Sequence, residues 1–192
     1  MLAGAQPSVA LGRDMTVLKE MMERTERRIE TELEDQPCVK ASLLKTLSEA
    51  YRQLDMFPKA EALGRESLRL ANLAHGQEHQ HTLESMLSLA GIIPYVGKLS
   101  EAREIQKKAI GIAERLHGPA SKQAAEAHGD YAETLRQANE RAESERESLH
   151  AIEILRQLNE PELLGLSLNT LAGTYYARGD FKQAAGLMRE AT

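Results

Sequence analysis

The sequence contains few of the residues on which several protein classes depend. One of its 192 residues is cysteine, none is tryptophan and only 4% are aromatic. The single cysteine, Cys38, cannot form an intrachain disulfide, which favours a reducing compartment such as the cytoplasm. Strands of β-sandwiches and β-barrels are rich in aromatic and β-branched residues, whereas Ala, Leu, Glu, Arg and Gln dominate this chain. These residues favour helices, so we expect an all-α fold.

Long apolar runs and clusters of positive charge are also missing. No stretch of 18 apolar residues is present, so no membrane span is expected. The first residues lack a basic segment followed by an apolar one, so we expect no signal peptide. The net charge is -5, and lysines and arginines do not cluster, so we expect no nucleic-acid partner. With 42% hydrophobic and 28% charged residues, the composition is typical of a folded soluble protein and not of a disordered one.

Similar segments recur along the chain at a nearly constant interval. FPKAEALGRESLRLA begins at Phe57, LSEAREIQKKAIGIA at Leu99, RAESERESLHAIEIL at Arg141 and FKQAAGLMREAT at Phe181. The first two steps are 42 residues long and the last is 40. Such an interval is typical of repeat proteins, in which each unit buries its apolar face against the next unit.

Aligning these segments places residues of one kind in the same position of each repeat. Two apolar and three small columns result: Leu47, Leu89, Tyr131, Leu171; Tyr51, Ile93, Leu135, Tyr175; Ser48, Ala90, Ala132, Ala172; Ala60, Ala102, Ser144, Ala184; and Ser67, Ala109, Ala151, Ala191. Spacings of three, four and seven residues put the positions of each segment on one helical face. The small residues predict sites where two helices cross closely, because a larger side chain would hold the backbones apart.

A further column marks the turn within each pair of helices. It contains Asp55, Gly97, Asn139 and Gly179. These residue types adopt left-handed backbone angles more readily than others, and such a residue commonly follows the end of a helix that reverses direction. Each repeat is therefore predicted to be a helical hairpin.

The last repeat resembles a known family. The segment LNTLAGTYYARGDFKQAAGLMREA, from Leu168, is similar to a tetratricopeptide repeat. It carries the family's pattern at Leu168, Leu171, Ala172, Tyr175, Gly179, Phe181, Ala184 and Ala191. The interval of 42 residues, and a long loop beginning at His75, resemble the kinesin-light-chain subtype. The resemblance covers residues 38–192 and implies a right-handed α-solenoid that binds proteins.

The predicted map contains nine helices. Residues 1–13 are expected to form a mobile tail, and residues 14–37 a helix that packs on the first repeat through Met21, Met22, Thr25 and Ile29. The solenoid, residues 38–192, is divided into repeats near 38–79, 80–119, 120–160 and 161–192. Pro94 should distort the end of its helix, and His128 and Arg141 stand in columns that are otherwise apolar.

The last repeat is incomplete, and no polar capping helix follows it. We therefore expect that the chain is part of a longer protein or that a partner covers its end. A homodimer formed through Leu187 and Met188 of the last helix is one such arrangement.

The first helices of stacked pairs are expected to line a concave groove that binds a peptide. The predicted binding residues are Lys45, Glu49, Arg52, Tyr95, Glu133, Arg136, Asn169 and Tyr176. In the resembled family, Asn or Lys in the column of Lys45 and Asn169 commonly holds a peptide backbone or carboxylate. Arginine suits carboxylates because its donors are forked. Tyr95 and Tyr176 would add flat apolar contact.

Three functions remain open. The first is a scaffold that binds a protein or peptide, with no catalytic residue and no cofactor. The second is a regulatory segment of a larger bacterial signalling protein, since residues 10–37 resemble a linker that follows a kinase domain; the chain has no Gly-rich loop, HRD or DFG motif. The third is a metal-dependent enzyme using His75, His79 and His81. We favour an inter-repeat loop for these histidines, because His75 and His117 each precede a glycine at a predicted helix end.

Overall fold

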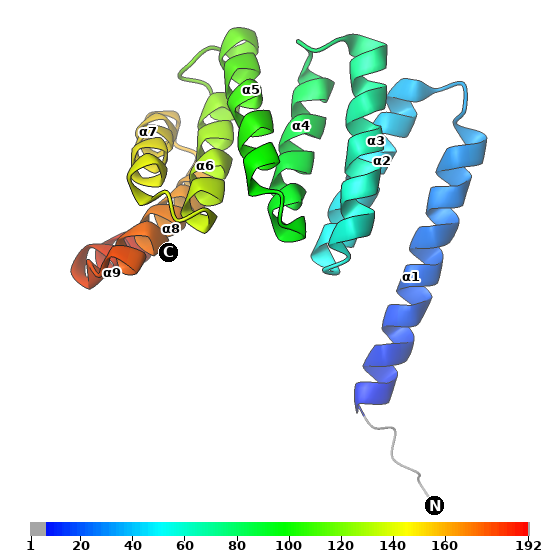
Figure 1. Ribbon diagram of the computed structural model, residues 1–192, viewed down its shortest axis with the longest axis horizontal. Helices are drawn as coiled ribbons and strands as arrows, with labels where there is room; N and C mark the ends of the chain where they lie inside the picture. The colour runs from blue at the N-terminus through cyan, green and yellow to red at the C-terminus, as the bar shows by residue number, and fades with distance from the viewer. Residues whose placement is uncertain (1–6, 192) are drawn as a thin grey trace, which may run out of the picture.

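The computed structural model describes residues 7–191, with side chains described from residue 16 onward. Within this part of the chain all regular structure is helical, which confirms the predicted all-α solenoid (Figure 1). The elements are α1 (Pro7–Glu32), α2 (Pro37–Gln53), α3 (Phe57–His75), α4 (Gln80–Ile92), a 3₁₀ helix η1 (Ile93–Val96), α5 (Leu99–His117), α6 (Lys122–Gln137), α7 (Arg141–Leu158), α8 (Pro161–Arg178) and α9 (Phe181–Glu190).

The helices stack as four antiparallel pairs. The pairs are α2 with α3, α4 with α5, α6 with α7, and α8 with α9, and each helix also packs against the next one along the chain. In addition α2 contacts α4, α4 contacts α6, and α6 contacts α8. The first helices of the pairs therefore form a continuous row. The stack is elongated and curved, with α1 at one end and α9 at the other (Figure 1).

Small side chains allow the two helices of each pair to cross closely. In the first pair, Ser48 is fully buried and its hydroxyl donates to the carbonyl oxygen of Ala60 at 2.7 Å. In the third pair the relationship is inverted, because the hydroxyl of Ser144 donates to the carbonyl oxygen of Ala132 at 2.9 Å. A serine in a small-residue column therefore donates a hydrogen bond to a backbone carbonyl of the facing helix. This bond removes most of the free-energy cost of burying the hydroxyl.

The turn column adopts the predicted left-handed conformation in all four pairs. The φ angles are 56° at Asp55, 79° at Gly97, 63° at Asn139 and 91° at Gly179. Asn159, which the sequence did not single out, has a φ of 56° at the junction between α7 and α8. The two turns that use aspartate or asparagine show that these residues can replace glycine at this position.

Two departures from the repeat pattern have local explanations. The α-helix α4 ends at Ile92 and continues as the 3₁₀ helix η1, which contains Pro94, as predicted for a proline that cannot donate a backbone hydrogen bond. His128 is 8% exposed in a column that is otherwise apolar. Its Nδ1 lies 2.7 Å from the carboxylate of Glu147, so this buried histidine has a hydrogen-bond partner on the neighbouring helix.

Helix α1 begins earlier than expected and packs through a narrower stripe. It starts at Pro7, so part of the tail predicted over residues 1–13 is helical, while residues 1–6 lie outside the described residues. Met22 and Ile29 are buried, but Met21 is 61% exposed and Thr25 is also exposed, so the expectation that these two pack on the repeats is wrong. Residues seven apart share a face, whereas Met21 is turned by about 100° from Met22.

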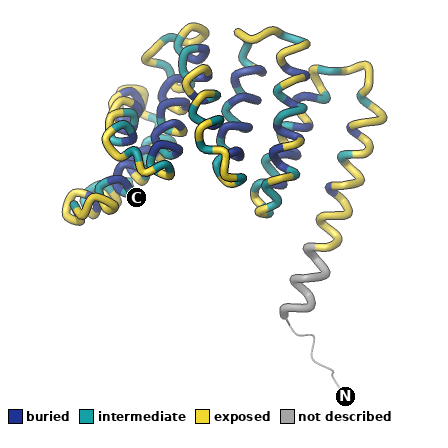
Figure 2. The backbone as a smooth tube through the Cα atoms, viewed as in Figure 1, coloured by how far each residue is buried: buried dark blue, intermediate teal, exposed yellow. Residues whose placement is uncertain are grey.

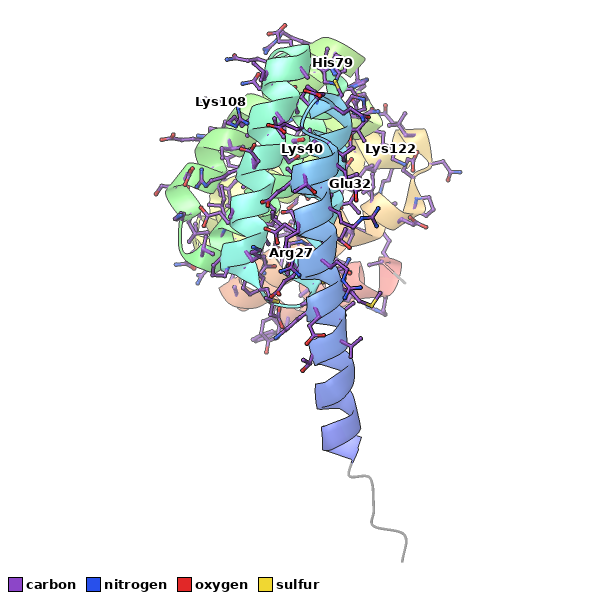
Figure 3. The ribbon with its side chains drawn as sticks, turned by 90° about the vertical axis from the view of Figure 1, so that its right-hand side faces the viewer. Arg27, Glu32, Lys40, His79, Lys108 and Lys122 are labelled. Carbon is purple, nitrogen blue, oxygen red and sulfur yellow. The ribbon has the colours of Figure 1, made fainter. Side chains whose placement is uncertain are left out.

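An ion pair also ties α1 to the first repeat. Glu26 lies 2.7 Å from Lys59 of α3. Seen from its own end of the stack, α1 runs in front of the repeats, with Arg27 and Glu32 along its length (Figure 3). Buried residues follow the contacts between helices through the whole stack (Figure 2), so the core is a series of linked clusters.

Candidate functional site

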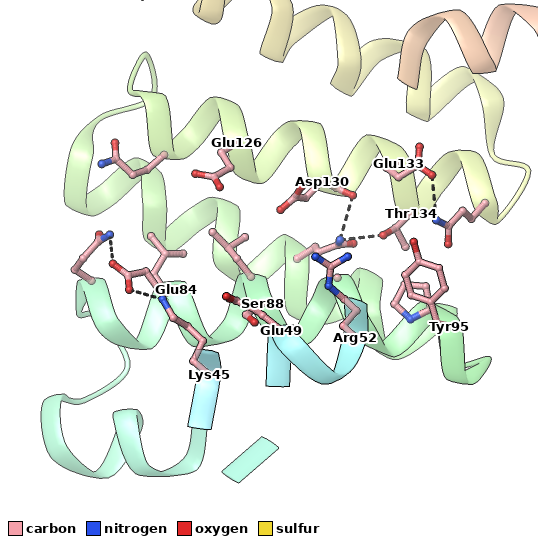
Figure 4. Close-up of a pocket in the computed structure, with 18 residues that line it drawn as sticks. Lys45, Glu49, Arg52, Glu84, Ser88, Tyr95, Glu126, Asp130, Glu133 and Thr134 are labelled. Carbon is pink, nitrogen blue, oxygen red and sulfur yellow. Dashed lines mark hydrogen bonds and ion pairs between the residues drawn. The ribbon is translucent and has the colours of Figure 1, made fainter. Parts of the chain in front are cut away.

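A groove follows the row of first helices and contains two adjoining cavities. The first, the acidic section, has a volume of about 410 Å³ and lies among α2, α4 and α6. Its walls include Lys45, Glu49, Arg52, Glu84, Ser88, Gly91, Tyr95, Gln106, Glu126, Asp130, Glu133 and Thr134 (Figure 4). The second, the apolar section, has a volume of about 490 Å³ and lies between α6 and α8. It is lined by Glu126, Gly129, Asp130, Glu133, Arg136, Leu163, Leu166, Ser167, Asn169, Thr170 and Gly173.

Most of the residues predicted to line the groove lie in one of these sections. Those in the acidic section are Lys45, Glu49, Arg52, Tyr95 and Glu133. Glu133 also lines the apolar section, together with Arg136 and Asn169. Tyr176 lines neither cavity; its ring packs edge-on against Phe181, with the ring centroids 5.2 Å apart.

Two of the three predicted cationic contacts are already paired. Lys45 Nζ lies 2.8 Å from the carboxylate of Glu84. Arg136 is held at 2.6 Å by Glu133, three residues earlier on the same helix. Burial raises the pKa of the Glu84 and Glu133 carboxyls. The hydrogen bonds and charges of their basic partners lower it by more, so both pKa values lie below the usual range. These pairs leave Arg52 as the free cation of the acidic section among the described residues.

Three carboxylates of the acidic section have no ion-pair partner within the described part of the chain. They are Glu49, Glu126 and Asp130. Asp130 is exposed along the groove, but the protein atoms around its carboxylate remove part of its hydration. Burial, reinforced by the charge of Glu126, raises the pKa of Asp130 to about 7, and the positive charge of Arg52 offsets this only in part. Burial also raises the pKa of Glu126.

The sequence interpretation missed Glu126 and Asp130, although a signal was present. Glu126, Asp130 and Glu133 are spaced by four and three residues on α6, so they share one helical face. Glu133 had been assigned to the groove from the repeat columns. Extending its face back by one and two turns would have found the other two carboxylates.

Two buried polar groups beneath the carboxylates also lack partners. Gln106 of α5 is 1% exposed, and its Nε2 donates to the carbonyl oxygen of Asp130 at 3.1 Å and to Thr134 Oγ1 at 2.9 Å. These bonds fix the amide, yet Gln106 Oε1 has no hydrogen-bond partner among the described residues, and neither has Ser88 Oγ. Both residues line the acidic section, where an unpaired buried acceptor calls for a donor from outside the chain.

The apolar section owes its shape to glycines and its character to leucines. Leu166 is 64% exposed, which is high for a large apolar side chain next to a cavity. A Cβ atom on Gly129 would lie 3.1 Å from Ser167 Oγ, and one on Gly173 would lie 3.1 Å from Arg136 Cδ. Glycine at these two positions therefore lets α6 and α8 approach each other closely.

The histidine cluster does not have the geometry of a metal site. The rings of His75 and His79 stack with centroids 4.3 Å apart, and the ring of His81 lies 5.2 Å from that of His75. Nowhere between residues 16 and 191 are three or more His, Cys, Asp or Glu side chains placed to hold a metal ion. His75 ends α3 and His117 ends α5, each before a glycine, as expected for a loop role. No described helix is long and apolar enough to cross a membrane.

Comparison with known families identifies the repeats. The profile described as "Tetratricopeptide repeat" matches residues 82–121 and 164–191. These two segments are tetratricopeptide repeats. The first match covers most of the second helix pair and the second match covers most of the fourth. No curated protein sequence matches the chain.

Solved structures share the tetratricopeptide fold at low sequence identity. BtubC (BKLC) from P. vanneervenii is 19% identical, with a TM-score of 0.75 over 93% of this chain and 72% of that one. A putative kinesin light chain from Podosopora anserina, with nearly identical TPR-like repeats, is 18% identical, with a TM-score of 0.70 over 81% and 74% of the two chains. The apo form of RapI is 15% identical, with a TM-score of 0.71 over 90% and 48%. These likenesses show that the chain shares the fold of these helical solenoids.

Proposed function

We propose that this tetratricopeptide solenoid is a scaffold that binds a peptide or protein partner in its concave groove. The observation that carries the proposal is the pair of adjoining cavities on α2, α4, α6 and α8, which together extend over all four repeats. Extended concave surfaces of this kind are the usual binding sites of solenoid proteins. The groove residues carry no nucleophile paired with a base, so the proposal assigns no catalytic step.

Recognition would combine hydrogen bonds, charge and apolar contact. Asn169 supplies amide donors and acceptors beside the apolar section. Tyr95 is 52% exposed and stacks on Phe57 with the rings 4.7 Å apart and within 7° of parallel, so it offers a fixed flat surface to a ligand. A side chain whose position is already fixed loses little entropy on binding, which strengthens the contact.

Affinity capture followed by mass spectrometry tests the proposal. The Arg136→Ala, Asn169→Ala double variant should recover less of each specific partner than the native chain, with an unchanged helical circular dichroism spectrum. The matched control is Lys108→Ala, Glu153→Ala, on the second helices α5 and α7. Both control residues are exposed, and Lys108 lies at the outer edge of the molecule (Figure 3). If the groove variant captures the same partners at the same strength as the control, the groove is not the binding site.

A regulatory role within a larger signalling protein is the second candidate, and α1 favours it. Val17 and Leu18 are 54% and 40% exposed, on a helix that buries Met22 and Ile29 against the repeats. A helix that presents apolar side chains on more than one face can contact a second body. A Val17→Ser, Leu18→Ser variant that keeps all groove-dependent partners but loses another would support this role, and an unchanged set of partners would contradict it.

Self-association through α9 is a separate proposal. Phe181 and Met188 are 60% and 48% exposed on this helix, and Leu187 is partly buried. Light scattering at high protein concentration should detect a dimer that the Met188→Ser variant does not form. A native chain that remains monomeric would contradict the proposal.

A cytoplasmic location also remains a prediction, based on the use of a single cysteine.

A further inference from the structure

Most of the unpaired polar groups in the acidic section are hydrogen-bond acceptors. The side chain of Glu49 comes from α2, and those of Glu126 and Asp130 come from α6 on the other side of the cavity (Figure 4). Gln106 also lines the cavity, and its buried Oε1 has no partner among the described residues. Ionised carboxylates and amide oxygens accept hydrogen bonds and cannot donate them. The Ser88 hydroxyl can either donate or accept a hydrogen bond. A ligand that satisfies this surface must therefore bring donors.

The charge balance points in the same direction. Five carboxylates and two basic side chains line the cavity. The pair between Lys45 and Glu84 closes one side, and Glu133 is engaged by Arg136. What remains is a group of three unpaired carboxylates facing the single cation Arg52, which reaches toward Asp130 from α2 (Figure 4). Negative charge exceeds positive charge at this place before a ligand arrives.

Gln106 provides an independent sign of a missing ligand atom. It is only 1% exposed. The two hydrogens of its amide are donated to the backbone carbonyl oxygen of Asp130 and to Thr134 Oγ1. The amide cannot rotate to pair its oxygen without losing these bonds. An acceptor fixed in this way and left without a donor costs free energy that a bound donor would recover.

We propose that the acidic section binds an arginine or lysine side chain of the partner, so that the groove recognises a basic peptide segment. The proposal rests on the proposed function and specifies the chemistry of the partner. A guanidinium or ammonium group would supply donors to the carboxylates and to Gln106 Oε1, and its charge would balance the excess of negative charge. The sequence led us to expect that Lys45, Arg52 and Arg136 bind a carboxylate of the partner. We instead propose that the carboxylates of the acidic section bind a cation of the partner.

The protonation state of Asp130 supports this assignment. The unfavourable burial of its charge, which holds its pKa near 7, would be relieved by a cation placed beside the carboxylate. The groups that face it are Glu126 and Glu133 on its own helix and Arg52 on α2. Binding of a cation should therefore release a proton near neutral pH, and affinity should increase as the pH rises through about 7.

Defined peptide pools test the proposal. The probes are fluorescein-labelled nonapeptides with arginine at the centre and mixed Ala, Ser and Leu at the other positions. The reference pool has citrulline at the centre, which keeps the shape of arginine and removes its charge. Fluorescence anisotropy should show that the arginine pool binds about tenfold more tightly, and that high salt reduces this difference.

Variants place the effect in the acidic section. Asp130→Asn and Glu126→Gln preserve side-chain shape and should each remove much of the preference for arginine, with Asp130→Asn weakening the arginine pool by about tenfold. Glu153→Gln, on the second helix α7, removes the same charge elsewhere and should change nothing. Circular dichroism spectra of all three variants should match the native spectrum, because the side chains are exposed.

The outcomes separate this proposal from the one on which it rests. Equal binding of the arginine and citrulline pools, or tighter binding of a glutamate-centred pool, would overturn the basic-segment proposal and leave peptide binding in place. If no pool binds and the groove variant Arg136→Ala, Asn169→Ala captures partners as well as its control does, both proposals fail. Arginine preference that survives in Asp130→Asn and Glu126→Gln would also overturn the assignment to this section.

Discussion

The two sections of the groove share α6 as a wall but differ in the chemistry of the opposite walls. In the acidic section, α2 and α4 face α6 with charged and polar side chains, and several acceptors remain unpaired. In the apolar section, α8 faces α6 with Leu163, Leu166 and glycine backbone. The repeats are therefore similar in their cores and specialised on their inner surface. A partner that spans both sections would need a basic side chain at one end and an apolar side chain at the other.

Reversing the charge in the acidic section should have the largest effect. Asp130→Lys places a second cation beside Arg52 and removes the carboxylate at the centre of the section. We expect the arginine-centred pool to bind about a hundredfold more weakly, which corresponds to about 2.7 kcal/mol. Fluorescence anisotropy measures the change, and Glu153→Lys is the control with the same change in net charge. A similar loss in the control would mean that overall charge, and not the acidic section, attracts the peptide.

Removing the apolar contact should have a smaller effect of a different kind. Leu166→Ser exposes no core, because Leu166 is already 64% exposed. We expect peptides with leucine next to the basic residue to bind about tenfold more weakly, since burying a leucine contributes about 1.5–3 kcal/mol at most. Raising the salt concentration should not alter this loss, in contrast to that of Asp130→Lys. A strongly salt-dependent loss would indicate that the two sections are not distinct.

The protonation of Asp130 should make stability depend on pH. Its pKa in the folded chain, about 7, is above its ordinary value of 3.8, so the folded state holds this proton more tightly than the unfolded state. The resulting stability is present below about pH 4 and is lost as the pH rises through about 7. Asp130→Asn should therefore match the native free energy of unfolding at about pH 4 and exceed it at about pH 8. We expect a gain of about 1 kcal/mol, because solvent in the groove screens the charge.

Urea denaturation at the two pH values measures this difference. Glu153→Gln serves as the control and should show no gain at either pH. A gain for Asp130→Asn that is the same at both pH values would contradict a pKa near 7 for this carboxyl.

The smallest effects should come from glycines in the two sections. A Cβ atom on Gly91, in the acidic section, meets nothing within 4 Å, so Gly91→Ala should stabilise α4 by about 0.5–1 kcal/mol through helix propensity. Gly129→Ala in the apolar section brings a methyl group to 3.1 Å from Ser167 Oγ, and the required shift should cancel most of that gain. Thermal denaturation compares the two variants. Equal gains would show that α6 and α8 are not closely packed at Gly129.

The fold could be predicted from sequence because repetition makes each position visible four times. The columns containing Ala60 and Leu89 identified buried positions, and the turn column identified every left-handed residue within a pair. Non-repeated features were harder to predict. The start of α1 at Pro7 has no counterpart in another repeat, and neither does the exposure of Met21.

The site was predictable in position but not in charge. Helical periodicity placed Lys45 and Arg136 on the inner row, but the ion pair between Lys45 and Glu84 joins residues 39 positions apart. Whether a lysine is free or paired depends on contacts between repeats, which the columns do not reveal. The unpaired oxygen of Gln106 is likewise visible only once α5 and α6 are packed together.

A crystal structure of the chain with an arginine-centred nonapeptide would test the account most directly. The account predicts the peptide in the concave groove, with the guanidinium about 3 Å from the carboxylate of Asp130 and from Gln106 Oε1. A peptide bound on the second helices, or one in the groove with its arginine directed to solvent, would contradict it.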